Sequence, residues 1–95
     1  MAVIRSFRDD DTESVYLRER IRGLDIRLQG VAQRKLWVLD AAERLEDLRL
    51  PPGNRLEKLS GDRREQHSIR INERWRICFR WRDGDAYDVE IVDYH

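Results

Sequence analysis

The sequence predicts an α+β domain in which an N-terminal strand and a two-helix hairpin pack on a twisted antiparallel four-stranded sheet. Three observations lead to this fold class. In the first half of the chain, apolar residues recur at three- and four-residue steps, which is typical of amphipathic helices. Two prolines and a glycine at positions 51–53 end the helical half, because they cannot continue a helix. After Asn54, apolar and polar residues alternate, which is the period of half-buried strands.

The N-terminal segment predicts one strand followed by one helix. Apolar and polar residues alternate over residues 2–7, as in a short strand. The acidic residues that follow can cap the first amides of a helix, and Asp10 with Glu13 resembles a capping box. A rough apolar stripe predicts the buried face of this helix, at Val15, Tyr16, Ile21 and Leu24.

The second helix has a clearer helical period. Its stripe recurs at three- and four-residue steps, at Val31, Lys35, Val38, Leu39, Ala42 and Leu45. Leu36 and Trp37 widen the face that this stripe would bury. We therefore expect this side of the helix to pack on the sheet.

The second half of the chain predicts four strands joined by turns. The strands are expected near residues 56–59, 67–71, 75–81 and 87–91. The turns between them are expected at 61–62, 72–74 and 83–85, where glycine, aspartate and asparagine gather. Successive turns of this length predict antiparallel neighbours.

The last hairpin admits two registers. With a two-residue loop, Asp88 and Glu90 would face the apolar row of the preceding strand. With a three-residue loop or a bulge, apolar side chains face one another, in the pairs Trp81–Tyr87, Phe79–Val89 and Ile77–Ile91. We prefer the second register, because a slip by one residue would move every side chain to the other face.

The preferred register also predicts the polar face of the sheet. Its pairs would be Arg80–Asp88, Cys78–Glu90 and Arg76–Val92. Tyr94 would lie on the same side, and alternation in the neighbouring strand adds Arg70. This face, away from the helices, would present arginines and an aromatic hydroxyl together.

Composition sets further bounds. The length predicts a single domain over residues 1–95, and apolar residues, at 40% of the chain, are enough for one modest core. No apolar run is long enough to cross a membrane, and the N-terminus lacks the apolar stretch of a signal peptide. One cysteine and two histidines give neither a disulfide nor metal-ligand spacing. We therefore expect a soluble cytoplasmic protein that uses no cofactor or metal.

The net charge is zero, but the charges are unevenly distributed. Residues 55–82 carry nine basic and four acidic side chains, and residues 83–95 carry five acidic and no basic ones. Eight of the nine basic residues are arginine, whose planar fork suits phosphate. The two stretches could neutralise each other through cross-strand pairs, or could hold a polyanion beside acid–base groups; charge alone leaves both open.

Five segments resemble the HigB toxins of the RelE/ParE toxin–antitoxin superfamily. They are Pro51-Pro52-Gly53-Asn54-Arg55-Leu56, Leu59-Ser60-Gly61-Asp62-Arg63, His67-Ser68-Ile69-Arg70-Ile71-Asn72, Trp75-Arg76-Ile77 and Val89-Glu90-Ile91-Val92-Asp93-Tyr94-His95. The resemblance covers nearly the whole chain and is strongest from about residue 50 onward. The ordered set, which ends at Asp93-Tyr94-His95, is specific, although each piece alone recurs across the superfamily.

The resemblance implies a RelE-like fold and a metal-independent cleavage of mRNA in the ribosomal A site. The ribose 2′-hydroxyl would attack the adjacent phosphate and leave a 2′,3′-cyclic phosphate. This chemistry needs a base, a group that stabilises charge on the phosphate, and an acid for the leaving oxygen. The implied partners are the 70S ribosome with mRNA and a HigA-like helix-turn-helix antitoxin, through which alone the protein would reach operator DNA. No membrane is involved.

The resemblance also implies the site residues. Asp93, Tyr94 and His95 match the family's terminal cluster, and His95, as the last residue given, would add its α-carboxylate. Arg76 would clamp the phosphate. Glu57 stands where some relatives have histidine, so either Glu57 is the base or His95 carries more of the proton transfer alone. Four further cations are expected to contact RNA or the ribosome: Lys58, Arg63, Arg70 and Arg80.

Two other functions remain open from the sequence. A ParE-like relative would poison DNA gyrase by contact without cutting RNA, and the departure at Glu57 allows a weakened toxin that acts as a co-repressor with its antitoxin. Several residues are expected to be structural. His67 would be a satisfied histidine at the core edge, Cys78 a small strand filler, and Trp37, Trp75 and Trp81 core residues.

Overall fold

The computed structural model describes residues 2–93 and confirms the α+β fold. The two α-helices are α1 (Asp10–Tyr16) and α2 (Ile26–Asp40). Three short 3-10 helices follow along the chain, η1 (Leu45–Arg49), η2 (Pro52–Asn54) and η3 (Gly61–Arg63). The strands are β1 (Glu57–Lys58), β2 (Gln66–Arg70), β3 (Trp75–Arg82) and β4 (Asp85–Asp93). They form one antiparallel sheet in the order β1-β2-β3-β4, as expected.

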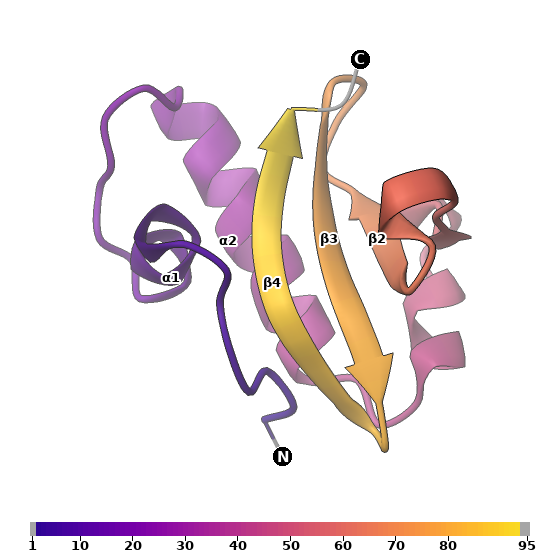
Figure 1. The fold of residues 1–95 in the computed structure, drawn as a ribbon. Helices are drawn as coiled ribbons and strands as arrows, with labels where there is room; N and C mark the ends of the chain where they lie inside the picture. The colour runs from indigo at the N-terminus through magenta and orange to yellow at the C-terminus, as the bar shows by residue number, and fades with distance from the viewer. Residues whose placement is uncertain (1, 94–95) are drawn as a thin grey trace.

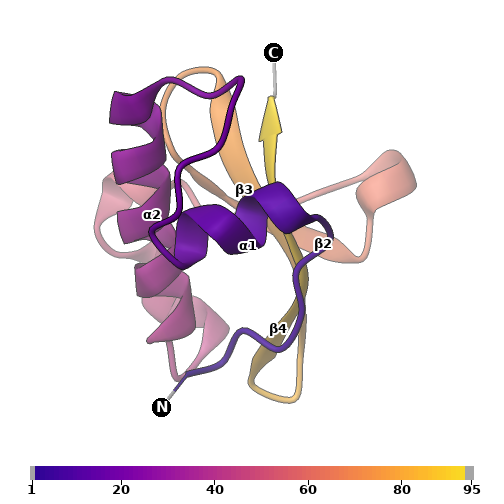
Figure 2. The ribbon, with the colours of Figure 1, turned by 90° about the vertical axis from the view of Figure 1, so that its left-hand side faces the viewer.

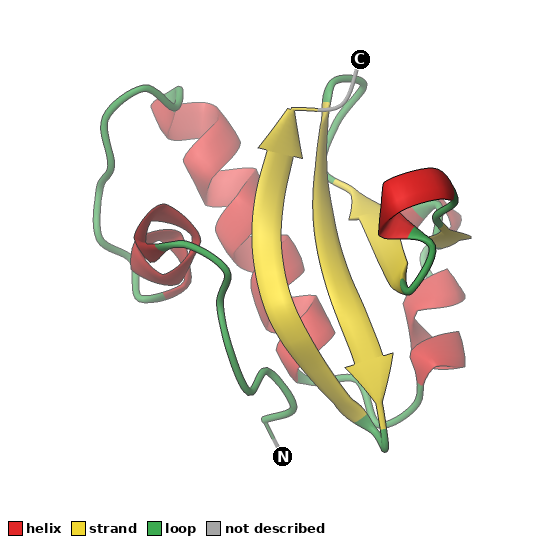
Figure 3. Cartoon of the chain, in the orientation of Figure 1, coloured by secondary structure: helices red, strands yellow, loops and turns green. Residues whose placement is uncertain are grey.

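One face of the sheet is covered by α2, and the other face is left to polar side chains. Figure 1 shows α2 behind β3 and β4 and α1 beside the β4 edge, and Figure 2 shows α1 running from α2 across that edge. The core lies between α2 and the long β3–β4 hairpin that dominates Figure 3. Its fully buried members include Leu36, Leu39, Ile69, Ile77, Phe79 and Val89. No helix within residues 2–93 is long and apolar enough to span a membrane.

The N-terminal segment is extended but does not form the strand predicted over residues 2–7. It makes two isolated parallel bridges to β4, Ile4 with Ala86 and Phe7 with Val89. Between them, the backbone amide of Asp88 donates to the Ser6 hydroxyl at 2.8 Å instead of to a backbone carbonyl. Asp88 has a left-handed φ of 52°, which turns its amide out of the regular ladder. The segment therefore pairs with β4 only intermittently.

The first helix begins and ends at positions other than those predicted, and the second ends earlier than predicted. Asp9, not Asp10, caps α1, because its carboxylate accepts a hydrogen bond from the amide of Thr12 at 2.7 Å. The helix ends at Tyr16, so Ile21 and Leu24 lie in the following segment, where they still pack partly against the core. Asp25 caps α2, which ends at Asp40, before the last two positions of the predicted stripe.

The buried face of α2 agrees with the predicted one only in part. It consists of Leu28, Ala32, Leu36 and Leu39, of which Leu36 and Leu39 were predicted. Trp37 is 41% exposed and Val38 is 38% exposed, so the expectation of a buried Trp37 was wrong. The predicted stripe contained Lys35, whose ammonium would be costly to bury, whereas the stripe that faces the sheet contains no charged residue.

The β3–β4 hairpin contains both of the registers considered. Next to the two-residue turn at Asp83–Gly84, where both φ angles are positive, Trp81 pairs with Ala86 and Arg80 with Tyr87. The ladder then shifts by one residue. Beyond that bulge the preferred register is confirmed, in the pairs Cys78–Glu90, Ile77–Ile91 and Arg76–Val92. The preferred register was wrong next to the turn, because Asp88 supplies the extra residue of a bulge there.

Candidate functional site

Arg76 is the central cation of the sheet face away from the helices. Arg76 is only 9% exposed, and its guanidinium is held by three acceptors. Nε donates to the Ser68 hydroxyl at 2.7 Å, and Nη2 donates to the Arg55 carbonyl at 2.6 Å. Nη2 also lies 2.9 Å from a carboxylate oxygen of Glu57. The guanidinium is therefore fixed in orientation by three different segments of the chain.

A hollow of about 330 Å³ opens beside Arg76, and we call it the arginine hollow. It is lined by Arg55, Glu57, Arg70, Asn72, Glu73 and Arg76. Strand pairing explains the gathering, because Arg70 on β2 is directly opposite Arg76 on β3, and Glu57 on β1 is opposite Ser68. Three cations and two carboxylates surround this space, so it keeps a net positive charge.

The arginine hollow brings together three of the residues predicted from the sequence: Glu57, Arg70 and Arg76. Arg70 makes no ion pair within residues 2–93, which leaves its charge available to a ligand. The sequence reasoning missed Arg55, Ser68, Asn72 and Glu73. Alternation in β2 could have placed Ser68 beside Arg76, but the carbonyl of Arg55 gives no signal in the sequence.

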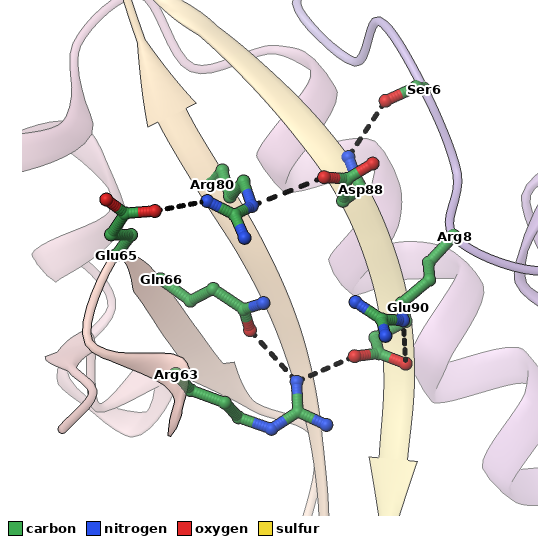
Figure 4. Close-up of polar contacts among 8 residues, drawn as sticks. All are labelled: Ser6, Arg8, Arg63, Glu65, Gln66, Arg80, Asp88 and Glu90. Atoms are coloured by element: carbon green, nitrogen blue, oxygen red, sulfur yellow. Dashed lines mark hydrogen bonds and ion pairs between the residues drawn. The ribbon is translucent and has the colours of Figure 1, made fainter. Parts of the chain in front are cut away.

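Arg63 and Arg80, which were predicted to contact RNA, form a network of ion pairs across β4 (Figure 4). Arg63 donates to Glu90 at 2.7 Å and to Gln66 at 2.9 Å, and Arg8 lies 3.8 Å from the same Glu90. These contacts fasten η3 over the polar face of the sheet. Beneath this layer Cys78 is fully buried, and burial raises the pKa of its thiol.

Arg80 lies between two carboxylates. It donates to Glu65 at 2.6 Å, and its Nε lies 3.3 Å from Asp88. The hydrogen bond from Arg80 lowers the pKa of the Glu65 carboxyl, with the positive charge acting in the same direction. The predicted contact between Arg80 and Asp88 is therefore present, although the bulge places Tyr87 opposite Arg80.

The described end of β4 holds Asp93 in place. Arg74 donates to it through Nε at 2.7 Å and through Nη2 at 2.6 Å. Asp93 pairs with Trp75 across the ladder, so it lies on the opposite side of the sheet from the Arg76–Val92 pair. Tyr94 and His95 lie outside the described residues, so their predicted roles stay predictions.

Lys58 and His67 lie away from the arginine hollow. Lys58 is exposed and pairs with His67 across the β1–β2 ladder. His67 stacks on Phe79 with ring centroids 6.2 Å apart, as expected for the core edge. Its Nδ1, however, is buried without a hydrogen-bond partner within residues 2–93, so it is not the satisfied histidine that was predicted. Burial, and secondly the charge of Lys58, lower the pKa of His67.

The arrangement around Arg76 suits an anionic ligand. A fixed guanidinium offers donors in the planar geometry that phosphate oxygens accept, and a carboxylate stands beside it as a possible proton acceptor. No group of three or more His, Cys, Asp or Glu side chains within residues 2–93 is placed to hold a metal ion.

Comparisons with known proteins identify similar sequences along the whole chain. The family model of RelE-like toxins of type II toxin–antitoxin system HigB matches residues 5–95. Toxin HigB-1 of Vibrio cholerae serotype O1 is 42% identical over 84 residues, which cover 87% of this chain and 88% of the relative. Endoribonuclease HigB of Proteus vulgaris is 28% identical over 93 residues, or 98% of this chain and 100% of that protein.

Proposed function

The chain belongs to the HigB family of RelE-like toxins of type II toxin–antitoxin systems, and we propose that it is an endoribonuclease that cleaves mRNA in the ribosomal A site. The observation that carries this proposal is the arginine hollow, where a fixed guanidinium, a second arginine and a carboxylate lie side by side. The Proteus vulgaris relative, which is similar over nearly the whole chain, is named an endoribonuclease.

In the proposed reaction, Arg76 stabilises the charge that develops on the scissile phosphate. The 2′-hydroxyl oxygen bonds to phosphorus, the bond from phosphorus to the 5′-oxygen breaks, and a 2′,3′-cyclic phosphate forms. Because Ser68 and the Arg55 carbonyl already hold the Arg76 guanidinium, little reorganisation is needed when the charge appears. Arg70, the cross-strand neighbour of Arg76, supplies a second positive charge.

We assign the proton transfers to Glu57 and to the C-terminal residues. The Glu57 carboxylate lies 2.9 Å from Arg76, so a phosphate bound by Arg76 would bring its neighbouring 2′-hydroxyl close to this base. His95 would return a proton to the 5′-oxygen as it leaves. Tyr94 would stack on a base, as readers of single-stranded RNA commonly do, and Asp93 would help to orient this end of the chain.

Membership of a type II family implies an antitoxin partner. We propose that this partner is a HigA-like helix-turn-helix protein and that the toxin reaches operator DNA only through it. Action on the 70S ribosome would place the protein in the cytoplasm. The exposed Lys58 and the half-exposed Arg80 would add contacts to RNA. Arg63 would serve mainly to hold η3 through Glu90.

The test is to add the purified protein to ribosomes that translate a defined mRNA and to map the new 5′ ends. We expect cuts at fixed codon positions, with little cutting of the same mRNA in the absence of ribosomes. Equal cutting of naked RNA would contradict the ribosome dependence. Absence of cuts, together with accumulation of gyrase–DNA cleavage complexes, would favour the gyrase-poison alternative instead.

The role of Glu57 is tested in the same assay. We expect both Glu57→Ala and Glu57→Gln to slow cleavage by about 10²–10⁴-fold, since both remove the base. If Glu57 serves only as the counter-ion of Arg76, Glu57→Gln should cleave at nearly the wild-type rate. His95→Ala, measured beside these variants, shows how much proton transfer depends on the terminal residue.

A further inference from the structure

The outer surface of the two helices carries exposed apolar side chains, far from the sheet face that holds Arg76. Within residues 2–93, the large apolar side chains that are exposed include Leu17 at 55%, Ile26 at 54%, Trp37 at 41% and Val38 at 38%. All four belong to the end of α1 or to α2. An exposed group of this kind on a small protein commonly marks an interaction site.

A shallow hollow of about 310 Å³ lies within this surface, and we call it the hairpin groove. Its lining comes from two parts of the chain: the end of α1 with the residues just after it (Val15, Arg18, Glu19, Arg20), and α2 (Ile26, Gln29, Gly30, Gln33). One stripe along α2 contains four residues at steps of four, three and four: Ile26, Gly30, Gln33 and Trp37. Gly30 leaves the middle of that stripe without a side chain, which opens the groove.

Two arginines, Arg18 and Arg20, line the groove together with Glu19, and the end of the Arg34 side chain lies beside Gly30. Between Leu17 and Val38 the chain has six cations and two anions, a net charge of +4. Arg18, Arg20, Arg22, Arg27 and Arg34 are exposed, and none of them forms an ion pair within residues 2–93. The Arg18 guanidinium instead lies 4.7 Å from the centre of the Trp37 ring. A partner with the complementary charge would be acidic.

We propose that the hairpin groove is the docking site for an acidic amphipathic segment of the antitoxin. Apolar side chains of that segment would cover Ile26 and Trp37, and its carboxylates would pair with Arg18 and Arg34. RNA fits less well, because the exposed aromatic ring near the groove, Trp37, is already covered by Arg18, and the exposed aliphatic side chains make no favourable contact with phosphate. The proposal rests on family membership and is independent of the proposed cleavage.

The test measures binding of the purified cognate antitoxin to the full-length toxin by isothermal titration at two salt concentrations. The charge-reversed variant Arg18→Glu/Arg34→Glu is compared with Arg64→Glu/Arg82→Glu, which reverses two exposed arginines elsewhere. We expect the first variant to weaken binding by at least tenfold, with a smaller salt dependence, and the second to bind as the wild type does. Equal affinities for the two variants would overturn the proposal.

A second variant, which changes no charge, tests the docking site even if the charge-reversed variant does not fold. In Gly30→Phe, the new Cβ would meet only the flexible end of Arg34, at 3.7 Å, so the backbone of α2 can accept a side chain at this position. The ring would fill the groove without changing any charge. We expect weaker antitoxin binding at an unchanged melting temperature, and wild-type binding would refute the docking site.

Ribosome-dependent cleavage is measured on the same two groove variants. If both keep full antitoxin binding but lose cleavage, the surface contacts ribosomal RNA and the proposal is wrong. If even the wild type cleaves nothing, the proposed nuclease function fails while the binding comparison still decides the docking site. The two proposals can therefore fail separately.

Discussion

The two surfaces of this molecule differ in how their arginines are paired. On the polar face of the sheet, Arg63, Arg76 and Arg80 are each held by a carboxylate, and only Arg70, among the arginines predicted there, makes no ion pair within residues 2–93. On the outer surface of the helices, the five exposed arginines between residues 18 and 34 make no ion pair within residues 2–93. A guanidinium that is paired and hydrogen-bonded has a fixed orientation and a neutralised charge. An unpaired guanidinium keeps its positive charge uncompensated, and its side chain can still change rotamer.

The difference in pairing suits the two sets of arginines to two tasks, the orientation of donors toward a phosphate and the attraction of an acidic partner. Catalysis needs donors that are already oriented when charge develops on a phosphate, and the contacts of Arg76 provide that orientation. Association with an acidic partner needs an uncompensated field, which steers the encounter and can be satisfied when the partner arrives. The paired arginines therefore suit a reaction site, and the unpaired arginines suit a docking surface.

A substitution of Arg76 is the most direct test of whether the paired and the unpaired arginines have different roles. We expect Arg76→Ala to slow ribosome-dependent cleavage by about 10²–10³-fold, the loss usual for one oriented donor to a developing anion. Arg34→Ala, the matched change on the outer surface, should leave cleavage unchanged. Single-turnover rates of both variants decide this, with melting curves to check folding. A similar loss in both would mean that the two surfaces share one role.

The two sides of α2 provide the next contrast. Leu36 is fully buried against the sheet, whereas Trp37 is 41% exposed. We expect Leu36→Ala to lower the free energy of unfolding by about 2–5 kcal/mol and Trp37→Ala by less than about 1 kcal/mol. Urea unfolding measures both. A large loss from Trp37→Ala would show that the outer surface is structural and not reserved for a partner.

Glu90 tests how far the ion pairs of the sheet face stabilise the fold. Its side chain is 13% exposed and contacts both Arg63 and Arg8. We expect Glu90→Ala to lower the unfolding free energy by about 1–3 kcal/mol, since it removes the carboxylate that contacts the guanidinium groups of Arg63 and Arg8. Glu19→Ala, on the outer surface, should change it by no more than about 0.5 kcal/mol. Equally small losses of unfolding free energy in the two variants would show that the ion pairs of Glu90 stabilise the fold no more than exposed surface pairs do.

The smallest expected effect concerns His67. Because burial lowers its pKa in the folded protein, the unfolded chain binds more protons once the pH falls through about 6.5. Stability should therefore fall with the pH below that point, until the lowered native pKa is reached. In His67→Phe this loss should be smaller by less than about 1 kcal/mol, since solvent screens the half-exposed ring. Identical pH profiles of unfolding would show that His67 does not titrate differently in the fold.

Much of the fold could be predicted because it depends on local periodicity. Alternation over residues 75–81 placed Ile77 and Phe79 in the core and Arg76 on the polar face, and the turns at Gly61 and Gly84 followed from residue type. The errors arose where two local patterns compete. On α2 the chain carries two apolar stripes, and contact with the sheet selected the one without Lys35.

The candidate site, like the fold, has parts that could be predicted from the sequence and parts that could not. Residue identity and spacing were enough to predict the family, the order of the strands and the presence of Arg76, Arg70 and Glu57 on neighbouring strands. Which arginines are neutralised depends on the three-dimensional fold, because ion pairs such as Arg63–Glu90 join residues far apart in the chain. It also decided that the bulge at Asp88 combines both registers of the hairpin, since the choice depends on core packing around Phe79 and Val89 that no local pattern encodes.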